Sequence, residues 1–383
     1  MPETEDKLRA RALLEKAKTA ESRADRSALA LALADVLGHR VHALETRDER
    51  RARRRAAQRL SSSRGVELAV AIADRFGRSR DPARRVASVV EVAEHLAPLD
   101  FLRPGERATF EAMRRMPKRL RPAAARAIER AIEREFRPYL VTLVGAKARV
   151  EAIRRDGAEP IAHLLGEDVV GERMAEARVE LEASLYERLG VRHLALKVSS
   201  ITSRIDPMGL GAALERTLPR AARIAEAAAR CGGSLVLDAE SSDDLELTLR
   251  LLEALAADPR FADVDLGFAL QAYLVDARAI TDRLLAIGHA RYERKARPLR
   301  VRLVKGANLG LERIRASLRG HPSAVHADKD ATDRAAQALL ELLASKEHTH
   351  AVHVALGSHN LFDVAHALVH RAAEALDDAL SFE

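Results

Sequence analysis

From about residue 138 onward, short apolar runs of β type alternate with amphipathic segments of helical spacing, and this alternation constrains the fold more than any other feature. Strands that alternate with helices along a chain build parallel βαβ units, so the pattern predicts a doubly wound sheet or a (β/α)8 barrel. The predicted strands are YLVTLVG (139–145), EPIAHLL (159–165), HLALKV (193–198), SLVLDA (234–239), LGFALQAY (266–273), LRVRLVKG (299–306) and VHVALG (352–357).

The glycine-rich turns that mark nucleotide-binding sheets are missing from these units. No GxGxxG follows the first strand, and the nearest segment, GLGAAL (209–214), can open a helix but lacks the third glycine. No GxxxxGK(S/T) phosphate loop occurs either. We therefore expect the barrel rather than the doubly wound sheet.

The preceding part of the chain differs in charge and in pattern. Residues 1–137 carry 32 Lys and Arg against 21 Asp and Glu, a net charge of +11, whereas residues 138–383 carry a net charge of −4. Apolar residues recur at helical spacing in RSALALALADVL (26–37) and GVELAVAIADRF (65–76). We predict a basic helical arm or domain over 1–137 and a barrel domain over 138–383.

The densest basic stretch of the chain lies in this helical part. It has two interpretations, a phosphate-binding arm for nucleic acid and a solvated helix face. No aromatic residue interrupts the run for base stacking, and no DNA-binding motif surrounds it, so we favour the helix face and expect no nucleic acid partner. The arginines concerned are Arg50, Arg51, Arg53, Arg54, Arg55 and Arg59.

Composition excludes several classes of protein. The single cysteine, Cys231, rules out a disulfide framework, and no CxxC pair is present to hold zinc. No apolar run approaches the ~20 residues needed to span a bilayer. The polar, acidic start MPETEDKLRA does not resemble a secretory signal. We expect a soluble cytoplasmic protein with at most peripheral membrane contact.

Ionisable or hydrogen-bonding side chains stand at the C-terminal ends of successive predicted strands. In a barrel these ends converge on one mouth, which is where active sites are built. Two or three cations with an acid and an amide suit an anionic, phosphate-bearing ligand. The residues are Lys197, Asp238, Gln271, Arg302, Lys305, His359 and Asn360.

The same strand ends carry a family resemblance. The matching segments, in chain order, are DGAEPIAHLLGE (156–167), LALKVSS (194–200), LVLDAE (235–240), GFALQAY (267–273), VRLVKGANL (301–309), the K-x-x-T-D of Lys329, Thr332 and Asp333, and GSHNLFD (357–363). Together they resemble the proline dehydrogenase family. From about residue 140 the chain is similar to the proline dehydrogenase region of bifunctional flavoenzymes that also carry an aldehyde dehydrogenase domain.

The resemblance implies a distorted (β/α)8 barrel that holds FAD non-covalently at the strand ends. It implies hydride transfer from the ring carbon beside the nitrogen of L-proline to the flavin, giving Δ1-pyrroline-5-carboxylate, with the electrons passed to membrane quinone. A pyrroline-5-carboxylate dehydrogenase domain or protein is then an expected partner. Lys197, Asp238 and Arg302 are the implied catalytic residues, and Lys197 and Asp238 are expected to form an ion pair. The implied cofactor contacts are Gln271, Arg302, Val304, Lys305, Gly306, Ala307, Lys329, His359 and Asn360.

The chain also departs from the family pattern. Asn308 and Leu309 stand where many members have an aromatic pair, and His163 replaces an Asp of relatives. In the family a pair of arginines on the last barrel helix, followed shortly by Glu-Asn, clamps the proline carboxylate, and this sequence has no counterpart of that segment. The chain stops at ALSFE, which has the pattern of a beginning seventh strand. We therefore expect a C-terminally truncated barrel without the last strands and helix, either part of a longer enzyme or an inactive flavin-binding module.

Other functions compete with this interpretation. Lys305 at a strand end also fits a Schiff-base aldolase, which leaves Gln271 and Arg302 unexplained. A basic helical arm on a defective barrel fits a nucleic-acid-binding module. A metal site is the third alternative, but a solvent-exposed loop explains its histidines better and we expect no metal. Those histidines are His348, His350, His353 and His359.

Overall fold

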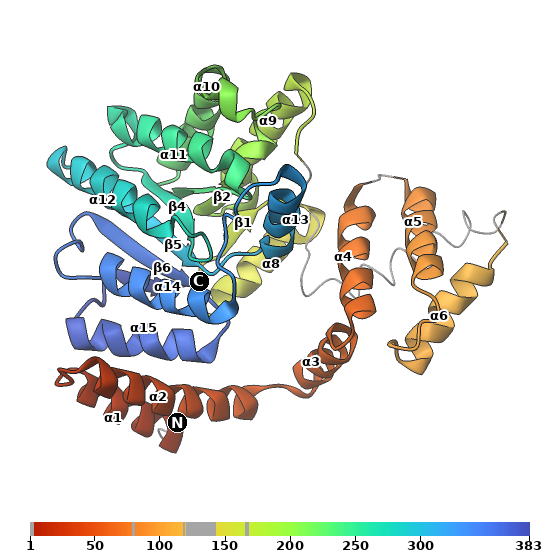
Figure 1. The fold of residues 1–383 in the computed structure, drawn as a ribbon, viewed down its shortest axis with the longest axis horizontal. Helices are drawn as coiled ribbons and strands as arrows, with labels where there is room; N and C mark the ends of the chain where they lie inside the picture. Colours follow the sequence, from red (N-terminus) through yellow and green to blue (C-terminus); the bar gives the residue numbers. More distant parts are fainter. Residues whose placement is uncertain (1–3, 79–80, 118, 120–142, 165–167) are drawn as a thin grey trace. The chain divides into compact units, whose positions relative to one another are not determined.

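The computed structural model describes residues 4–78, 81–117, 119, 143–164 and 168–383 (Figure 1). The chain divides into two compact units, Met1–His42 with Lys147–Glu383, and Ala43–Ala146. The predicted boundary between residues 137 and 138 lies outside the described residues. The division differs from the predicted one because the first 42 residues belong with the sheet.

The described strands form one seven-stranded parallel sheet in strict chain order. Within the described residues β1 pairs only with β2 and β7 only with β6, so the curled sheet is open. The predicted parallel βαβ units and the incomplete (β/α) barrel are thereby confirmed. The strands are β1 (Ile161–His163), β2 (His193–Lys197), β3 (Ser234–Asp238), β4 (Asp265–Gln271), β5 (Leu299–Val304), β6 (Val352–Gly357) and β7 (Leu380–Phe382).

Helices follow the strands and pack against the sheet (Figure 1). Strand β3 is apolar on both faces, as buried parallel strands are; Leu235 and Leu237 are fully buried and Val236 nearly so. In β5 burial alternates, so Leu299, Val301 and Leu303 are buried while the residues between them are partly exposed on the other face. The helices of this unit after β1 are α9 (Glu172–Leu189), α10 (Leu210–Arg230), α11 (Ser242–Ala257), α12 (Ala277–Glu293), α13 (Leu309–Arg319), α14 (Lys329–Leu343) and α15 (Leu361–Glu374), with 3-10 turns η2 (Val198–Ser200), η3 (Pro207–Gly209) and η4 (Pro259–Phe261).

The predicted strand at 139–145 is corrected in its described part. Residues 139–142 lie outside the described residues, whereas Leu143–Gly145 form the first turn of helix α8 (Leu143–Arg155). The apolar run leads directly into AKARVEAIRR, which is rich in strong helix formers, and the helix they favour extends back into the run.

The first two helices, α1 (Glu5–Ala17) and α2 (Arg23–Leu44), pack on α15. Ala30 and Leu33 of α2 are buried in one cluster with Ala365 and Val369 of α15. An ion pair of 2.9 Å between Arg26 of α2 and Glu374 of α15 also joins the two helices. These helices therefore cover the last helix of the sheet unit.

The second unit is helical, as predicted, with α3 (Arg47–Leu60), α4 (Ser63–Arg78), α5 (Pro82–His95) and α6 (Pro104–Arg115). Its core includes Leu68, Val86 and Val89. The arginine-rich stretch is helix α3, which opens with a capping box between Thr46 and Glu49. Among the helices described here, none is long and apolar enough to cross a membrane.

Candidate active site

The register of the sheet brings the predicted strand-end residues to one edge. Lys197 and Asp238 end β2 and β3 and lie opposite each other. Gln271 at the end of β4 lies opposite Val304 at the end of β5, and Val304 lies opposite Gly357 at the end of β6. Because all these strands are parallel, their carboxyl ends form one continuous polar edge.

Lys197 is paired with a different acid from the one predicted. Its ammonium forms an ion pair with Glu240, and in the described chain no ion pair joins it to Asp238. Asp238 and Glu240 are two residues apart, and the chain turns after β3 so that the second acid reaches the lysine. The expected Lys197–Asp238 ion pair is wrong, although both residues stay at neighbouring strand ends.

The Asp238 carboxylate is left without a hydrogen bond or an ion pair in the part of the chain that the structure describes. Burial raises the pKa of Asp238; the positive charge of Arg302 opposes that rise and the negative charge of Glu240 adds to it. A carboxyl group with a raised pKa and no protein partner is suited to binding a polar ligand or accepting a proton.

Two amide side chains hold the turn that follows β3. The Gln271 Nε2 donates a hydrogen bond to the carbonyl oxygen of Ala239, and the Asn308 Nδ2 donates one to the carbonyl oxygen of Glu240. Asn308 thus links the turn after β5 to the turn after β3. These contacts fix the backbone that carries Glu240.

Arg302 has a carboxylate partner that the sequence analysis did not assign. Its Nε lies 2.7 Å from the Oε2 of Glu383, close enough for an ion pair, but the N–H is not aligned for a hydrogen bond. Arg300, two residues earlier on the same face of β5, is bound by Asp265 at 2.9 Å. The less buried face of β5 therefore carries two arginines, each beside an acid.

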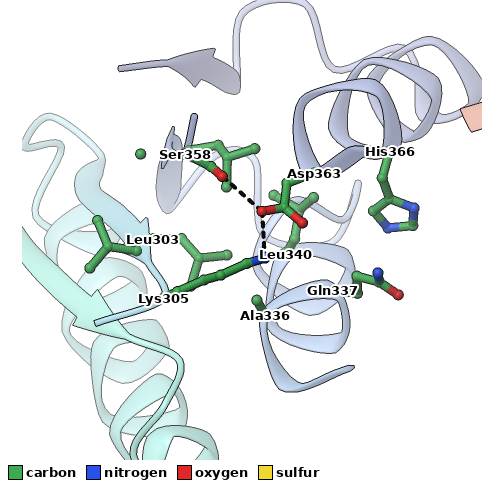
Figure 2. A pocket seen from close by; sticks show the side chains of 11 residues that line it. Leu303, Lys305, Ala336, Gln337, Leu340, Ser358, Asp363 and His366 are labelled. Atoms are coloured by element: carbon green, nitrogen blue, oxygen red, sulfur yellow. Dashed lines mark hydrogen bonds and ion pairs between the residues drawn. The ribbon is translucent and has the colours of Figure 1, made fainter. Parts of the chain in front are cut away.

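Lys305 is held between two carboxylates from different helices (Figure 2). Its Nζ lies 2.7 Å from Asp333 of α14 and 2.8 Å from Asp363 of α15. Burial lowers the pKa of Lys305, but the hydrogen bonds and charges of the two acids outweigh it, so that the pKa is raised. A Schiff-base lysine needs a depressed pKa, so the aldolase alternative loses its support.

The remaining predicted cofactor residues lie at the same edge. Gly306 and Ala307 follow β5 as exposed backbone, and Gly306 has a φ of +123°. Lys329 opens α14, is 71% exposed and pairs with Asp333. His359 is exposed beside Asn360, whose side chain caps α15 by accepting a hydrogen bond from the Phe362 amide.

The histidines considered for a metal site do not gather at one point. His348 is buried rather than exposed, and its Nδ1 lies 3.2 Å from the Nε2 of His289. His353 sits within β6 and His359 follows that strand at its opposite end. Within the described ranges, no group of three or more His, Cys, Asp or Glu side chains is arranged to hold a metal ion.

Sequence reasoning missed the acids that complete this edge. Each lies within a segment that carried the resemblance or the seventh-strand pattern, so the signal was present, but no partner was assigned. They are Glu240, Asp333, Asp363 and Glu383.

Known proteins match this chain over the sheet unit and beyond it. Residues 146–383 match the family model described as proline dehydrogenase. Over 137 residues, 36% of this chain, the sequence is 32% identical to the bifunctional protein PutA of Salmonella typhimurium and also 32% identical to that of Escherichia coli. Each match spans only 10% of the length of the relative.

Solved structures of the same kind share the fold. Proline utilization A from Corynebacterium freiburgense has a TM-score of 0.62 at 26% identity, covering 70% of this chain and 29% of that one. Proline utilization A from Bdellovibrio bacteriovorus has a TM-score of 0.68 at 19% identity, covering 98% and 36%, and this likeness concerns the fold alone.

The parallel sheet with a polar edge at its carboxyl ends defines a (β/α)-barrel protein of the class that places its ligand site at the strand ends. The family match covers more than half of the chain. This chain belongs to the proline dehydrogenase family.

Proposed function

We propose that this chain carries out the FAD-dependent oxidation of L-proline to Δ1-pyrroline-5-carboxylate and passes the electrons to a quinone. The observation that carries the proposal is the family match over residues 146–383 together with the strand-end edge that this region builds. The product would pass to a pyrroline-5-carboxylate dehydrogenase domain or protein; the relatives are described as bifunctional proteins.

The residues at the edge fit a flavin. Arg302 has a buried Nε without an aligned hydrogen-bond acceptor in the described structure, and a flavin ring presents nitrogen and carbonyl acceptors. Gln271 uses its Nε2 on Ala239 but keeps its side-chain oxygen free of any hydrogen bond from the described chain. Arg302 and Gln271 would contact the ring, and the backbone of 304–307 would line it.

When bound, FAD would supply the hydride acceptor for the carbon beside the proline nitrogen. Asp238, with its open carboxylate, would orient the substrate amine and accept its proton. Lys197, held by Glu240, would lie near the substrate carboxylate with its other N–H groups free to donate. The positive charge of Arg302 would favour the negative charge that develops on the ring.

The phosphate and adenosine parts would extend along the ends of β5 and β6. Lys329 is exposed enough to leave Asp333 and meet an anion, and His359 and Asn360 would flank the adenosine. These roles follow the family resemblance residue by residue.

Flavin binding tests the proposal directly. We would titrate FAD with the flavin-free chain and follow the flavin fluorescence, with Arg302→Met as the variant and Arg250→Met, an exposed arginine of α11, as the matched control. We expect saturable binding, weakened about tenfold by Arg302→Met, as befits a lost charged hydrogen bond, and unchanged by the control. A folded chain that binds no FAD but binds nucleic acid in a salt-dependent way would replace the proposal with the binding-module alternative.

A further inference from the structure

Lys305 lies at the centre of a small network at the ends of β5 and β6. Its ammonium bridges Asp333 of α14 and Asp363 of α15 at 2.7 and 2.8 Å. Asp363 is only 8% exposed, and a cavity of about 20 Å³, which has room for roughly one water molecule, adjoins the pair. Figure 2 shows Lys305, Asp363 and Ser358 pointing toward one another.

Asp363 also contacts the turn after β6, and so connects Lys305 to that turn. The Ser358 hydroxyl donates a hydrogen bond of 2.7 Å to Asp363 Oδ2, the same oxygen that meets Lys305. The Ser358 oxygen in turn accepts a hydrogen bond of 3.2 Å from the backbone N–H of Asn360. The segment 358–360 is therefore tied to β5 through one buried carboxylate.

The charges around Lys305 argue against a direct contact with phosphate. Its single positive charge faces two carboxylates, and Lys329 also pairs with Asp333, so the network holds two positive and two negative charges and Lys305 has no uncompensated charge to offer an anion. An anion at Lys305 would also lie close to both carboxylates, whose repulsion opposes the attraction of the lysine. Lys329, which shares Asp333 and is 71% exposed, is the lysine here with an accessible charge.

We propose that Lys305 and Asp363 are positioning residues, which fix the segment 358–360 through Ser358 and so shape the adenosine side of the cofactor site. Lys305 then supports the cofactor without touching its phosphates. The inference rests on the proposed function, because it assumes that the edge holds FAD.

Comparison of two flavins tests this role. FMN contains the ring and one phosphate but lacks the adenosine half, so a defect confined to segment 358–360 weakens FAD and spares FMN. We would measure the dissociation constants of FAD and FMN for the flavin-free chain and for three variants, Ser358→Ala, Asp363→Asn and Lys305→Met. Lys346→Met, an exposed lysine outside the network, is the matched control.

We expect Ser358→Ala and Asp363→Asn to weaken FAD by about tenfold and FMN by less than about threefold, since one or two buried hydrogen bonds to a charged group are lost. Ser358→Ala keeps the Lys305–Asp363 ion pair, so it reports on the segment even if Lys305→Met fails to fold. An equal loss for both flavins, or no loss for either, overturns the positioning role. An unsubstituted chain that binds neither flavin contradicts the proposed function instead.

Discussion

Lys197 and Asp238 are register partners at the ends of adjacent strands, yet the ammonium of Lys197 is bound by Glu240. Asp238 is thereby left as an open carboxylate beside a cation that is already held in place. This arrangement separates two roles that a single Lys197–Asp238 ion pair would have merged, because one acid fixes the lysine and the other remains available to a ligand.

Double-mutant cycles distinguish the two acids. Lys197 is 13% exposed and Glu240 is 31% exposed, so breaking their ion pair by Lys197→Met should lower the free energy of unfolding by about 2–3 kcal/mol, below the usual range for a fully buried pair. The cycle of Lys197→Met with Glu240→Gln should show a coupling of about 1 kcal/mol or more, and the cycle with Asp238→Asn a smaller one. Urea unfolding measures both; a larger coupling to Asp238 would contradict the observed pairing.

His163 should stay neutral in the folded chain until the solution is distinctly acidic. His163 is exposed at the end of β1, yet partial desolvation of its ring, followed by the charges of Lys197 and Arg302, lowers the pKa of His163 to about 4. Between about pH 6.5 and 4 the unfolded chain takes up a proton at His163 and the folded chain does not. The free energy of unfolding should therefore decrease as the pH falls from about 6.5 to 4, and this site should not change it above about pH 6.5. Histidine NMR titration checks this, and Lys197→Met should move the pKa of His163 upward. A midpoint near 6.5 would refute it.

Glu182 predicts a pH dependence of the opposite sign. It is 1% exposed on α9, and burial raises the pKa of Glu182 to about 7 despite the charges of Arg178 and Lys197. The unfolded chain releases this proton near pH 4.5, whereas the folded chain keeps it up to about pH 7. The free energy of unfolding should therefore decrease by about 3 kcal/mol as the pH rises from about 4.5 to 7. Glu182→Gln should remove that part of the pH dependence in thermal unfolding. Identical pH profiles for the two proteins would contradict the prediction.

Gly306 should not tolerate a side chain. Its φ is +123°, and a Cβ at this position would lie 2.5 Å from the ring of Tyr273. Gly306→Ala should therefore destabilise the fold by about 2 kcal/mol or more, through backbone strain and the clash together. Gly310→Ala is the control, because nothing lies within 4 Å of a Cβ there. Equal unfolding temperatures for the two variants would count against this reading of the turn after β5.

The packing of α2 on α15 predicts a sharp difference between two leucines of one helix. Leu33 is 1% exposed in the cluster with Ala365 and Val369, whereas Leu31 is 62% exposed. Leu33→Ala should cost about 2–4 kcal/mol of stability and Leu31→Ala less than about 0.5 kcal/mol. Similar effects of both substitutions on unfolding would indicate that α2 does not dock on α15 through this face.

The strands of the sheet were predictable because each is a short, buried apolar run. VHVALG coincides with β6, and β2 to β5 differ from their predicted runs by at most two residues at either end. The strand predicted at 139–145 is wrong in its described part, where the residues are helical. The apolar run borders a segment of strong helix formers, and nothing in its sequence marks where the helix should begin. Local pattern therefore placed the strand ends but not every element between them.

The ion pairs of the site depend on information that a local pattern lacks. Asp238 and Glu240 are two residues apart, and only the course of the turn after β3 decides which of them meets Lys197. Lys305 finds Asp333 and Asp363 on helices that begin 24 and 56 residues further along the chain. The sequence showed which residues reach the edge, whereas tertiary structure determines their partners.

The central claim is that the strand-end edge binds FAD and oxidises L-proline. The most direct measurement is the visible absorption spectrum of the FAD-loaded chain before and after the anaerobic addition of L-proline. The proposed function predicts that the flavin absorption bleaches with proline and not with D-proline. A folded, FAD-loaded chain whose spectrum does not change would contradict the claim that this chain turns over proline.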